Sequence, residues 1–208
     1  MKRTVLAVLL GLGLSVSAYA NPQMYFSLAT QYDQQGDYEQ AARLYQKAAE
    51  LGHGESQYNL GVMYYQGEGV ELDRNQAAQW YEIAARQGHV KAQYNLGVMY
   101  EHGDGVATDA QLAAMWYGKA AEQDHMDAQY NLGNLYSAGN GVEKNATMAM
   151  SWWEQAADQG HAQANHNLAV RYHSGNGVKR DVGVAKQYYA KACEAGIQQS
   201  CDAYRKIY

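Results

Sequence analysis

The chain has 208 residues, of which 16 are basic, 21 are acidic and two are cysteines. This length allows one or two ordinary domains. The formal net charge of −5 argues against nucleic-acid binding, because that affinity depends on cationic side chains that neutralise phosphates. It argues equally against an electrostatic attachment to anionic lipids.

The first 20 residues have the pattern of a cleavable signal peptide. Lys2 and Arg3 form a basic start, residues 5–16 are largely apolar, and residues 18–20 (AYA) match the small-x-small pattern of a cleavage site. The apolar run is shorter than the roughly 20 residues that a membrane-spanning helix needs; an uncleaved N-terminal anchor is the alternative. Cleavage leaves 14 basic and 21 acidic residues, a net charge of −7. We expect a periplasmic or secreted protein with no membrane insertion after cleavage.

From residue 58 onward, one sequence pattern recurs every 36 residues. Its four copies are YNLGVMYYQGEGV, YNLGVMYEHGDGV, YNLGNLYSAGNGV and HNLAVRYHSGNGV, which begin at Tyr58, Tyr94, Tyr130 and His166. A shorter first copy begins near Phe26, 32 residues before Tyr58, and lacks the Gly-x-Gly-Val loop. A period of this length indicates a solenoid of stacked supersecondary units.

Each full unit is predicted to form a helix, a loop, a second helix and a turn. In the third unit, apolar residues recur at helical spacing on both sides of residues 103–106 (GDGV), whose two glycines favour a turn. Asp109 stands where the second helix needs an N-cap. The second helix should end near Asp124, which replaces the glycine of sister units and tolerates the left-handed conformation. The equivalents of Asp109 are Asp73, Asn145 and Asp181.

Small residues recur at one point of every first helix. They are Ala29, Gly61, Gly97, Gly133 and Ala169. Glycine inside a helix costs about 1 kcal/mol relative to alanine, so its repetition indicates that a neighbouring helix approaches closely. Alanine pairs in the second helices provide a matching flat surface, and larger aromatic rings fill the wider gaps. These rings belong to Trp80, Trp116, Trp152 and Tyr188.

The combined pattern YNLGVMY…GxGV…D…A…WY…AA…QGH resembles the Sel1-like repeat, a relative of the tetratricopeptide repeat. The resemblance covers about residues 22–208 and implies an all-α, right-handed solenoid of stacked antiparallel helix pairs with a curved inner surface. It also implies adaptor or scaffold work that holds protein partners in complexes. The expected units are 22–53, 54–89, 90–125, 126–161 and 162–196, followed by a terminal capping helix at 197–208.

The two cysteines, Cys193 and Cys201, lie close together near the C-terminus. In an oxidising compartment such a pair usually forms a disulfide. The alternative, a reactive pair, is less favoured because Cys-x7-Cys lacks the short spacing of redox-active thiols. The segment also resembles the Cys-x7-Cys bridge of cysteine-rich Sel1-like proteins, which implies that the disulfide holds the capping helix in place.

Sequence motifs for catalysis are missing from the chain. It contains no His-Glu-x-x-His, Walker or Gly-x-Ser-x-Gly motif and no Ser-x-x-Lys spacing. Each Gly-x-Gly-Val loop could cradle a phosphate, but it follows no predicted strand and occurs four times, which favours a simple turn. Four histidines recur at the unit junctions, and stacked units should space them apart rather than gather them around a metal. They are His53, His89, His125 and His161. We expect neither a cofactor nor a metal.

The candidate binding residues lie on the first helices, which line the inner groove in the tetratricopeptide pattern. With Gly97 as the register mark, Ala92 and Leu96 fall on the packing face, and Lys91 and Tyr94 fall on the groove face. This register selects Tyr58, Tyr65, Tyr94, His102, Tyr130, Asn134, His166 and His173. Tyrosine suits binding surfaces because it offers contact area and a hydrogen bond at low entropic cost; the alternative is that the rings only pack between units.

Asn134 also matches the register of the asparagine in carboxylate-clamp tetratricopeptide domains. Lys91 is the one basic residue that the register places near this face, so a clamp is a minor hypothesis. The leading prediction is an exported, non-enzymatic module that binds a protein segment or peptide of the cell envelope on its concave face. The main alternative is a penicillin-binding, β-lactamase-like or peptidoglycan-contacting protein, which the resemblance to cysteine-rich members supports. A toxin-immunity or secretion accessory protein is a third possibility.

Overall fold

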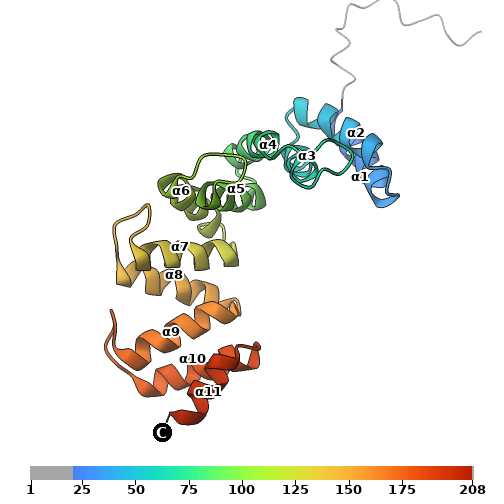
Figure 1. Cartoon of the computed structure of the whole chain (residues 1–208). Helices are drawn as coiled ribbons and strands as arrows, with labels where there is room; N and C mark the ends of the chain where they lie inside the picture. Colours follow the sequence, from blue (N-terminus) through green and yellow to red (C-terminus); the bar gives the residue numbers. More distant parts are fainter. Residues whose placement is uncertain (1–20, 208) are drawn as a thin grey trace, which may run out of the picture.

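The computed structural model describes residues 21–207 as a curved stack of helices (Figure 1). The first helices of the five units are α1 (Pro22–Gln34), α3 (Gly54–Gln66), α5 (Val90–His102), α7 (Met126–Ala138) and α9 (Ala162–Ser174). The second helices are α2 (Tyr38–Glu50), α4 (Arg74–Arg86), α6 (Ala110–Ala121), α8 (Ala146–Asp158) and α10 (Val182–Glu194). The short α11 (Gln198–Lys206) follows the last pair. The predicted signal peptide, residues 1–20, lies outside the described residues.

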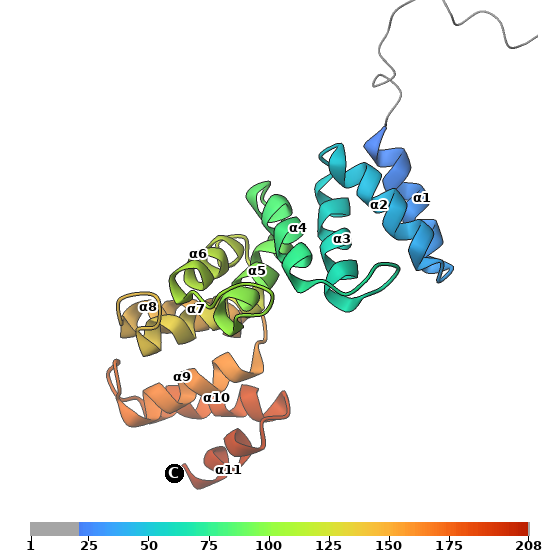
Figure 2. The same cartoon turned by 45° about the horizontal axis from the view of Figure 1, so that its top comes forward.

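Consecutive helices pack against each other along the whole stack, and the chain bends progressively from α1 to α11 (Figures 1 and 2). Residues 21–207 contain no strand. The prediction of an all-α solenoid is therefore confirmed. Within this range, no helix is both long and apolar enough to cross a membrane.

The helix boundaries follow the predicted capping signals. The Asp109 carboxylate accepts hydrogen bonds from the backbone N–H groups of Gln111 and Leu112, at 2.9 and 3.0 Å, so it caps α6 as expected. Asp124 has a φ of 61°, which confirms the left-handed conformation predicted after the second helix. The three sister residues also accept N-cap hydrogen bonds; they are Asp73, Asn145 and Asp181.

The glycines inside the first helices lie against aromatic rings of the second helix in the same unit. A Cβ atom added to Gly97 would lie 2.7 Å from Cδ1 of Tyr117, and one on Gly61 would lie equally close to Tyr81. The ring of Trp153 approaches Gly133 in the same way. The expected close approach is confirmed, and it occurs between the two helices of one unit.

The second glycine of each loop has a packing role between units. Gly105 has a φ of 75°, and a Cβ there would overlap the backbone carbonyl of Arg74, the first residue of α4 in the preceding unit. Gly69 and Gly141 meet the backbone of Tyr38 and Ala110 in the same way. Each loop is therefore pressed onto the start of the previous second helix.

Replacing Gly105 with alanine tests this packing role. Alanine at this position must adopt a left-handed conformation, which costs about 1–2 kcal/mol. Its Cβ also overlaps the backbone of Arg74, which costs about 1–3 kcal/mol. We expect the free energy of unfolding, measured with urea, to fall by about 3 kcal/mol. Gly88→Ala is the matched control, because Gly88 also has a positive φ but no atom within 4 Å of the added Cβ. Equal losses in the two variants would contradict the inter-unit contact.

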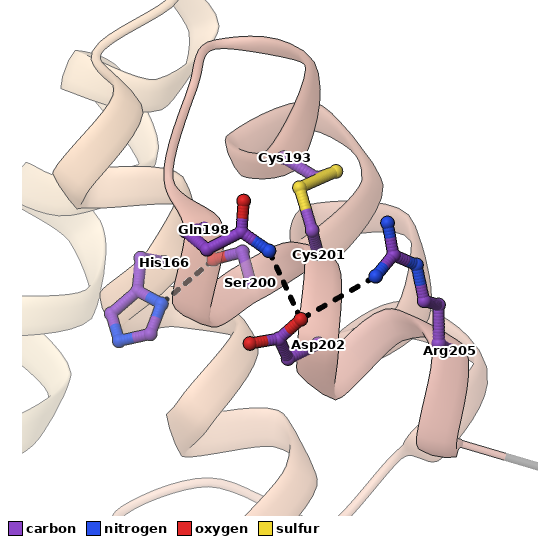
Figure 3. The surroundings of a disulfide bond; sticks show 7 residues. All are labelled: His166, Cys193, Gln198, Ser200, Cys201, Asp202 and Arg205. Atoms are coloured by element: carbon purple, nitrogen blue, oxygen red, sulfur yellow. Dashed lines mark hydrogen bonds and ion pairs between the residues drawn. A yellow bond between two sulfur atoms is a disulfide. The ribbon is translucent and has the colours of Figure 1, made fainter.

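A disulfide joins the end of α10 to α11 (Figure 3). Cys193 and Cys201 have Cα atoms 4.6 Å apart, which confirms the predicted pairing. The buried Ser200 hydroxyl lies 2.8 Å from Nδ1 of His166 on α9, and the buried Ile207 packs against Tyr189. The terminal helix is thus attached by one covalent bond and by contacts to both helices of the last unit.

Removing the disulfide should weaken this terminal attachment. In the chain-entropy model, closing so short a loop contributes about 2–3 kcal/mol, so the Cys193→Ser/Cys201→Ser variant should lose that much stability. Hydrogen exchange should accelerate first in α11, because the other units make their own junctions. Uniform acceleration across all units would show that the bond stabilises more than the terminal helix.

Candidate functional site

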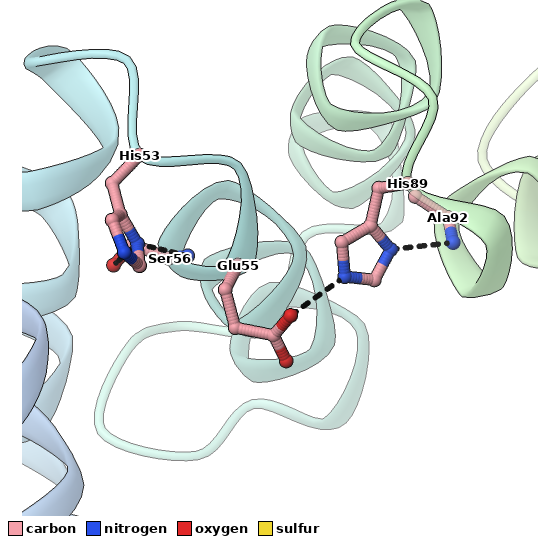
Figure 4. A network of polar contacts seen from close by, with 5 residues as sticks. All are labelled: His53, Glu55, Ser56, His89 and Ala92. Atoms are coloured by element: carbon pink, nitrogen blue, oxygen red, sulfur yellow. Dashed lines mark hydrogen bonds and ion pairs between the residues drawn. The ribbon is translucent and has the colours of Figure 1, made fainter.

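In each of the four full units, a histidine caps the N-terminus of the first helix. His89 Nδ1 accepts a hydrogen bond from the backbone N–H of Ala92 at 3.2 Å, and its Nε2 lies 3.0 Å from the Glu55 carboxylate of the preceding unit (Figure 4). His53 caps α3 in the same way, through the backbone N–H of Ser56 (Figure 4). Within residues 21–207, no three His, Cys, Asp or Glu side chains are grouped so that they could hold a metal ion. The junction histidines each cap a first helix, and His89 also contacts the preceding unit through Glu55.

Three candidate tyrosines stack on these histidines. The ring centroids of Tyr58 and His89 are 4.5 Å apart, with an interplanar angle of 18°. Tyr94 and Tyr130 stack on the histidine of the following unit at 4.5 and 4.3 Å. One face of each half-buried ring is consequently covered. These tyrosines connect adjacent units, and a ligand contact through the remaining edge stays a prediction.

Three other candidates lie apart from one another. The Tyr65 hydroxyl donates a 2.7 Å hydrogen bond to Asp104 of the next unit. His102 is exposed in the last turn of α5. His173 Nδ1 lies 3.4 Å from the Tyr189 hydroxyl and lines a hollow beside α11. The structure does not gather these three residues into one site.

Asn134 and His166 do converge, on a pocket between α7 and α9. The pocket has a volume of about 470 Å³, within the range that small ligands or side chains occupy. Its lining residues are Asn134, Ser137, Ala138, Trp153, His166, Asn167, Val170, Arg171, Ser174 and Asn176. Trp153 comes from α8, so both helices of the fourth unit and the first helix of the fifth build this site.

Polar contacts connect the lining residues of this pocket, hereafter the α7–α9 pocket. Trp153 Nε1 donates a hydrogen bond to Asn134 Oδ1 at 3.1 Å, and Asn167 Nδ2 donates to the same oxygen at 3.4 Å. Arg171 Nη2 donates to the Ser137 hydroxyl at 2.6 Å. The Arg171 guanidinium also lies over the Trp153 ring, 5.6 Å from its centroid. These residues therefore form one connected cluster.

Three members of the cluster depart from the residues that their sister units carry. Arg171 stands in the register of three buried apolar side chains, Met63, Met99 and Leu135. Trp153 stands in the register of Tyr45, Tyr81, Tyr117 and Tyr189. Asn134 stands in the register of Val62, Val98 and Val170. The sequence reasoning missed Arg171 and Trp153; a basic residue in an apolar register was the signal that could have found them.

Burial changes the protonation of the histidines in this half of the stack. Desolvation lowers the pKa of His125, His161 and His166 from the ordinary value of 6.5, and the Asp127 carboxylate opposes this effect at the first two. A cap histidine must also be neutral at Nδ1, because protonation there removes the hydrogen-bond acceptor. When the pH falls below 6.5, these three histidines therefore bind more protons in the unfolded chain than in the folded chain.

The stability of the folded chain should therefore depend on pH. Because the folded-state pKa values are lowered, the contribution is fully present above about pH 6.5 and is lost as the pH falls toward the folded-state values. We expect the urea midpoint to decrease over this range. His125→Asn keeps a capping side chain but cannot titrate, so its midpoint should fall less steeply with decreasing pH. His102→Asn, on an exposed residue, is the control; parallel profiles for all three proteins would refute the assignment.

The repeat units match a known family along the chain. The Sel1 repeat matches residues 18–53, 54–89, 90–125, 127–161 and 162–197. The chain belongs to the Sel1 repeat family. Its repeat fold generally serves protein–protein interaction. No curated protein matches the chain.

Solved structures share the same architecture. A protective antigen of uropathogenic Escherichia coli, c5321, is 34% identical with a TM-score of 0.85; the match covers 90% of this chain but only 41% of that one. A Sel1 repeat protein from Oxalobacter formigenes is 35% identical with a TM-score of 0.80, and the match covers 88% of this chain and 73% of the other. The tetratricopeptide protein YrrB is 22% identical with a TM-score of 0.57, and the match covers 89% of this chain and 93% of the other. At this identity the similarity supports a shared fold and nothing more.

Proposed function

We propose that this Sel1 repeat chain is an exported, non-enzymatic interaction module that binds a segment of another cell-envelope protein along its first helices. The α7–α9 pocket carries this proposal. There, unit-specific residues replace the repeat pattern and line an accessible hollow. The general role of the family in protein–protein interaction supports a macromolecular partner.

The pocket is suited to anchor such a segment. Exposed Val170 offers an apolar contact at its rim, and the indole of Trp153 and the Arg171 guanidinium form its deeper part. Aromatic and arginine side chains dominate binding energy at protein interfaces because they combine contact area with directed hydrogen bonds. Tyr94 and Tyr130 precede the pocket in the same register, and their free edges would extend the binding surface.

Two observations support export. The first is the disulfide between Cys193 and Cys201, since disulfides form and persist mainly in oxidising compartments. The similar E. coli protein is a protective antigen, which is a property of proteins that reach the cell surface or the medium.

The alternative of a β-lactam-hydrolysing enzyme has less support. His166 pairs with a serine hydroxyl, but Ser200 is completely buried between α9 and α11. A nucleophile must reach its substrate, and this hydroxyl does not. A nitrocefin assay on the purified protein should therefore show no turnover above buffer.

Site-specific photo-cross-linking tests the proposed binding surface. A photoreactive residue replaces either Val170, which is 40% exposed in the pocket, or Ile83, which is 41% exposed on α4. The two side chains are similar in size and exposure, so non-specific binding would give cross-linked adducts at both positions. We expect defined envelope adducts from position 170 only. Adducts from position 83 alone would place the binding surface elsewhere.

A further inference from the structure

Two arginines of the described chain lie over an aromatic ring, and only one of them has an anionic partner. Arg74 lies 5.3 Å from the Tyr65 ring centroid, and its Nη1 donates to Asp104 Oδ1 at 2.8 Å. The Tyr65 hydroxyl donates to the other oxygen of the same carboxylate. Arg171 has the equivalent ring in Trp153, but its partner is the neutral Ser137 hydroxyl. Within residues 21–207, no carboxylate lies within ion-pair distance of Arg171.

Arg171 is also the more deeply placed of the two. Every other arginine of residues 21–207 is exposed, whereas Arg171 is partly buried. A guanidinium removed from water loses hydration that only an anion or several acceptors can replace. One hydroxyl and one ring face leave most of its N–H donors without an acceptor in the protein. The pocket thus has a positive charge that the described chain does not neutralise.

Asn134 provides a second donor beside Arg171. An indole N–H can only donate, so the hydrogen bond from Trp153 fixes Asn134 Oδ1 as the acceptor. The Asn134 amide NH₂ is left to donate toward a ligand. Neither Asp nor Glu lines the α7–α9 pocket or the smaller hollow on the other side of Trp153 and Arg171, which Lys144 and Met150 also line. Such a site selects hydrogen-bond acceptors that carry negative charge.

We infer that the α7–α9 pocket binds a carboxylate of the partner segment, in the position that Asp104 takes relative to Arg74. The planar guanidinium of Arg171 would pair with both carboxylate oxygens, a geometry that arginine favours, and Asn134 would donate a further hydrogen bond. The carboxylate comes either from the C-terminus of the bound chain or from an Asp or Glu side chain within it. This inference rests on the proposed function and names the chemistry of its anchor.

Acetate is the simplest probe of this pocket. The Trp153 indole N–H is a local reporter, because it bonds to Asn134, and the indole signals of Trp80, Trp116 and Trp152 serve as internal references. In NMR titrations of the mature chain, we expect acetate to shift the Trp153 indole signal saturably. Acetamide and chloride at equal concentration should leave it in place. An equal response to acetamide, or no saturable response to acetate, would overturn the inference.

The internal repeat supplies a variant that should fold well. Arg171→Met restores the residue of Met63 and Met99, so we expect the variant to be at least as stable as the parent chain while losing the acetate response. Lys179→Met is the control for lost charge, because Lys179 is exposed and does not line the α7–α9 pocket. An unchanged acetate response in a folded Arg171→Met variant would also overturn the inference.

Short peptides of mixed sequence distinguish the two sources of the carboxylate. One pool lacks Asp and Glu and ends in a free carboxylate, a second is the same pool with amidated ends, and a third is amidated but contains Asp and Glu. We expect the first or the third pool to bind about tenfold more tightly than the second, since a charge-assisted pair is lost in the amide. Equal binding of all three would refute the carboxylate anchor. Cross-linking at position 170 would still test the proposed function separately.

Discussion

The structure depends on the way in which each unit satisfies the last backbone groups of the unit before it. A second helix ends with carbonyl groups that have no partner within the helix. Gln57, Gln93 and Gln129, all buried, donate their side-chain amides to the carbonyls of Ala49, Ala85 and Ala121 at 3.0–3.2 Å. Each of these glutamines also accepts a hydrogen bond from the glutamine that ends the second helix of its own unit. Because an unpaired buried amide is costly, these bonds favour the stacking register in which each glutamine reaches that carbonyl.

The last unit departs from these junctions on both sides. Towards the fourth unit, Asn165 replaces the glutamine; its Nδ2 donates to the His161 carbonyl, and its Oδ1 has no hydrogen-bond partner within residues 21–207. His166 and Ile197 replace the stacked tyrosine and the capping histidine. Towards the C-terminus, α11 is attached through the disulfide, the His166–Ser200 hydrogen bond and the burial of Ile207. The substitutions at His166 and Ile197 lie at the contact with α11, whereas Arg171 and Asn134 lie outside that contact.

The sequence was sufficient for the fold because periodicity, caps and turn glycines all indicated the same units. Asp109, the left-handed Asp124 and the disulfide followed from local chemistry and are confirmed. The candidate site was harder to predict because its residues come from α7, α8 and α9, and only packing shows that they meet. Tyr58, Tyr94 and Tyr130 stood out by their repetition. That repetition is what an inter-unit contact requires, while residues of a specific site are expected to differ between units.

A solenoid allows such differences because its energetics are local. Each unit contacts mainly its neighbours, so stability is approximately a sum of unit and junction terms. An arginine in the register of Met99 loses apolar burial at one point, but the His161 cap of α9 and the Asp181 cap of α10 remain intact. The cost stays within the fourth and fifth units, and α7, α8 and α9, which position Asn134, Trp153 and Arg171, are capped like their sister helices. A repeat protein can therefore acquire a specific pocket by replacing a few side chains in one unit while its sister units preserve the shape of the stack.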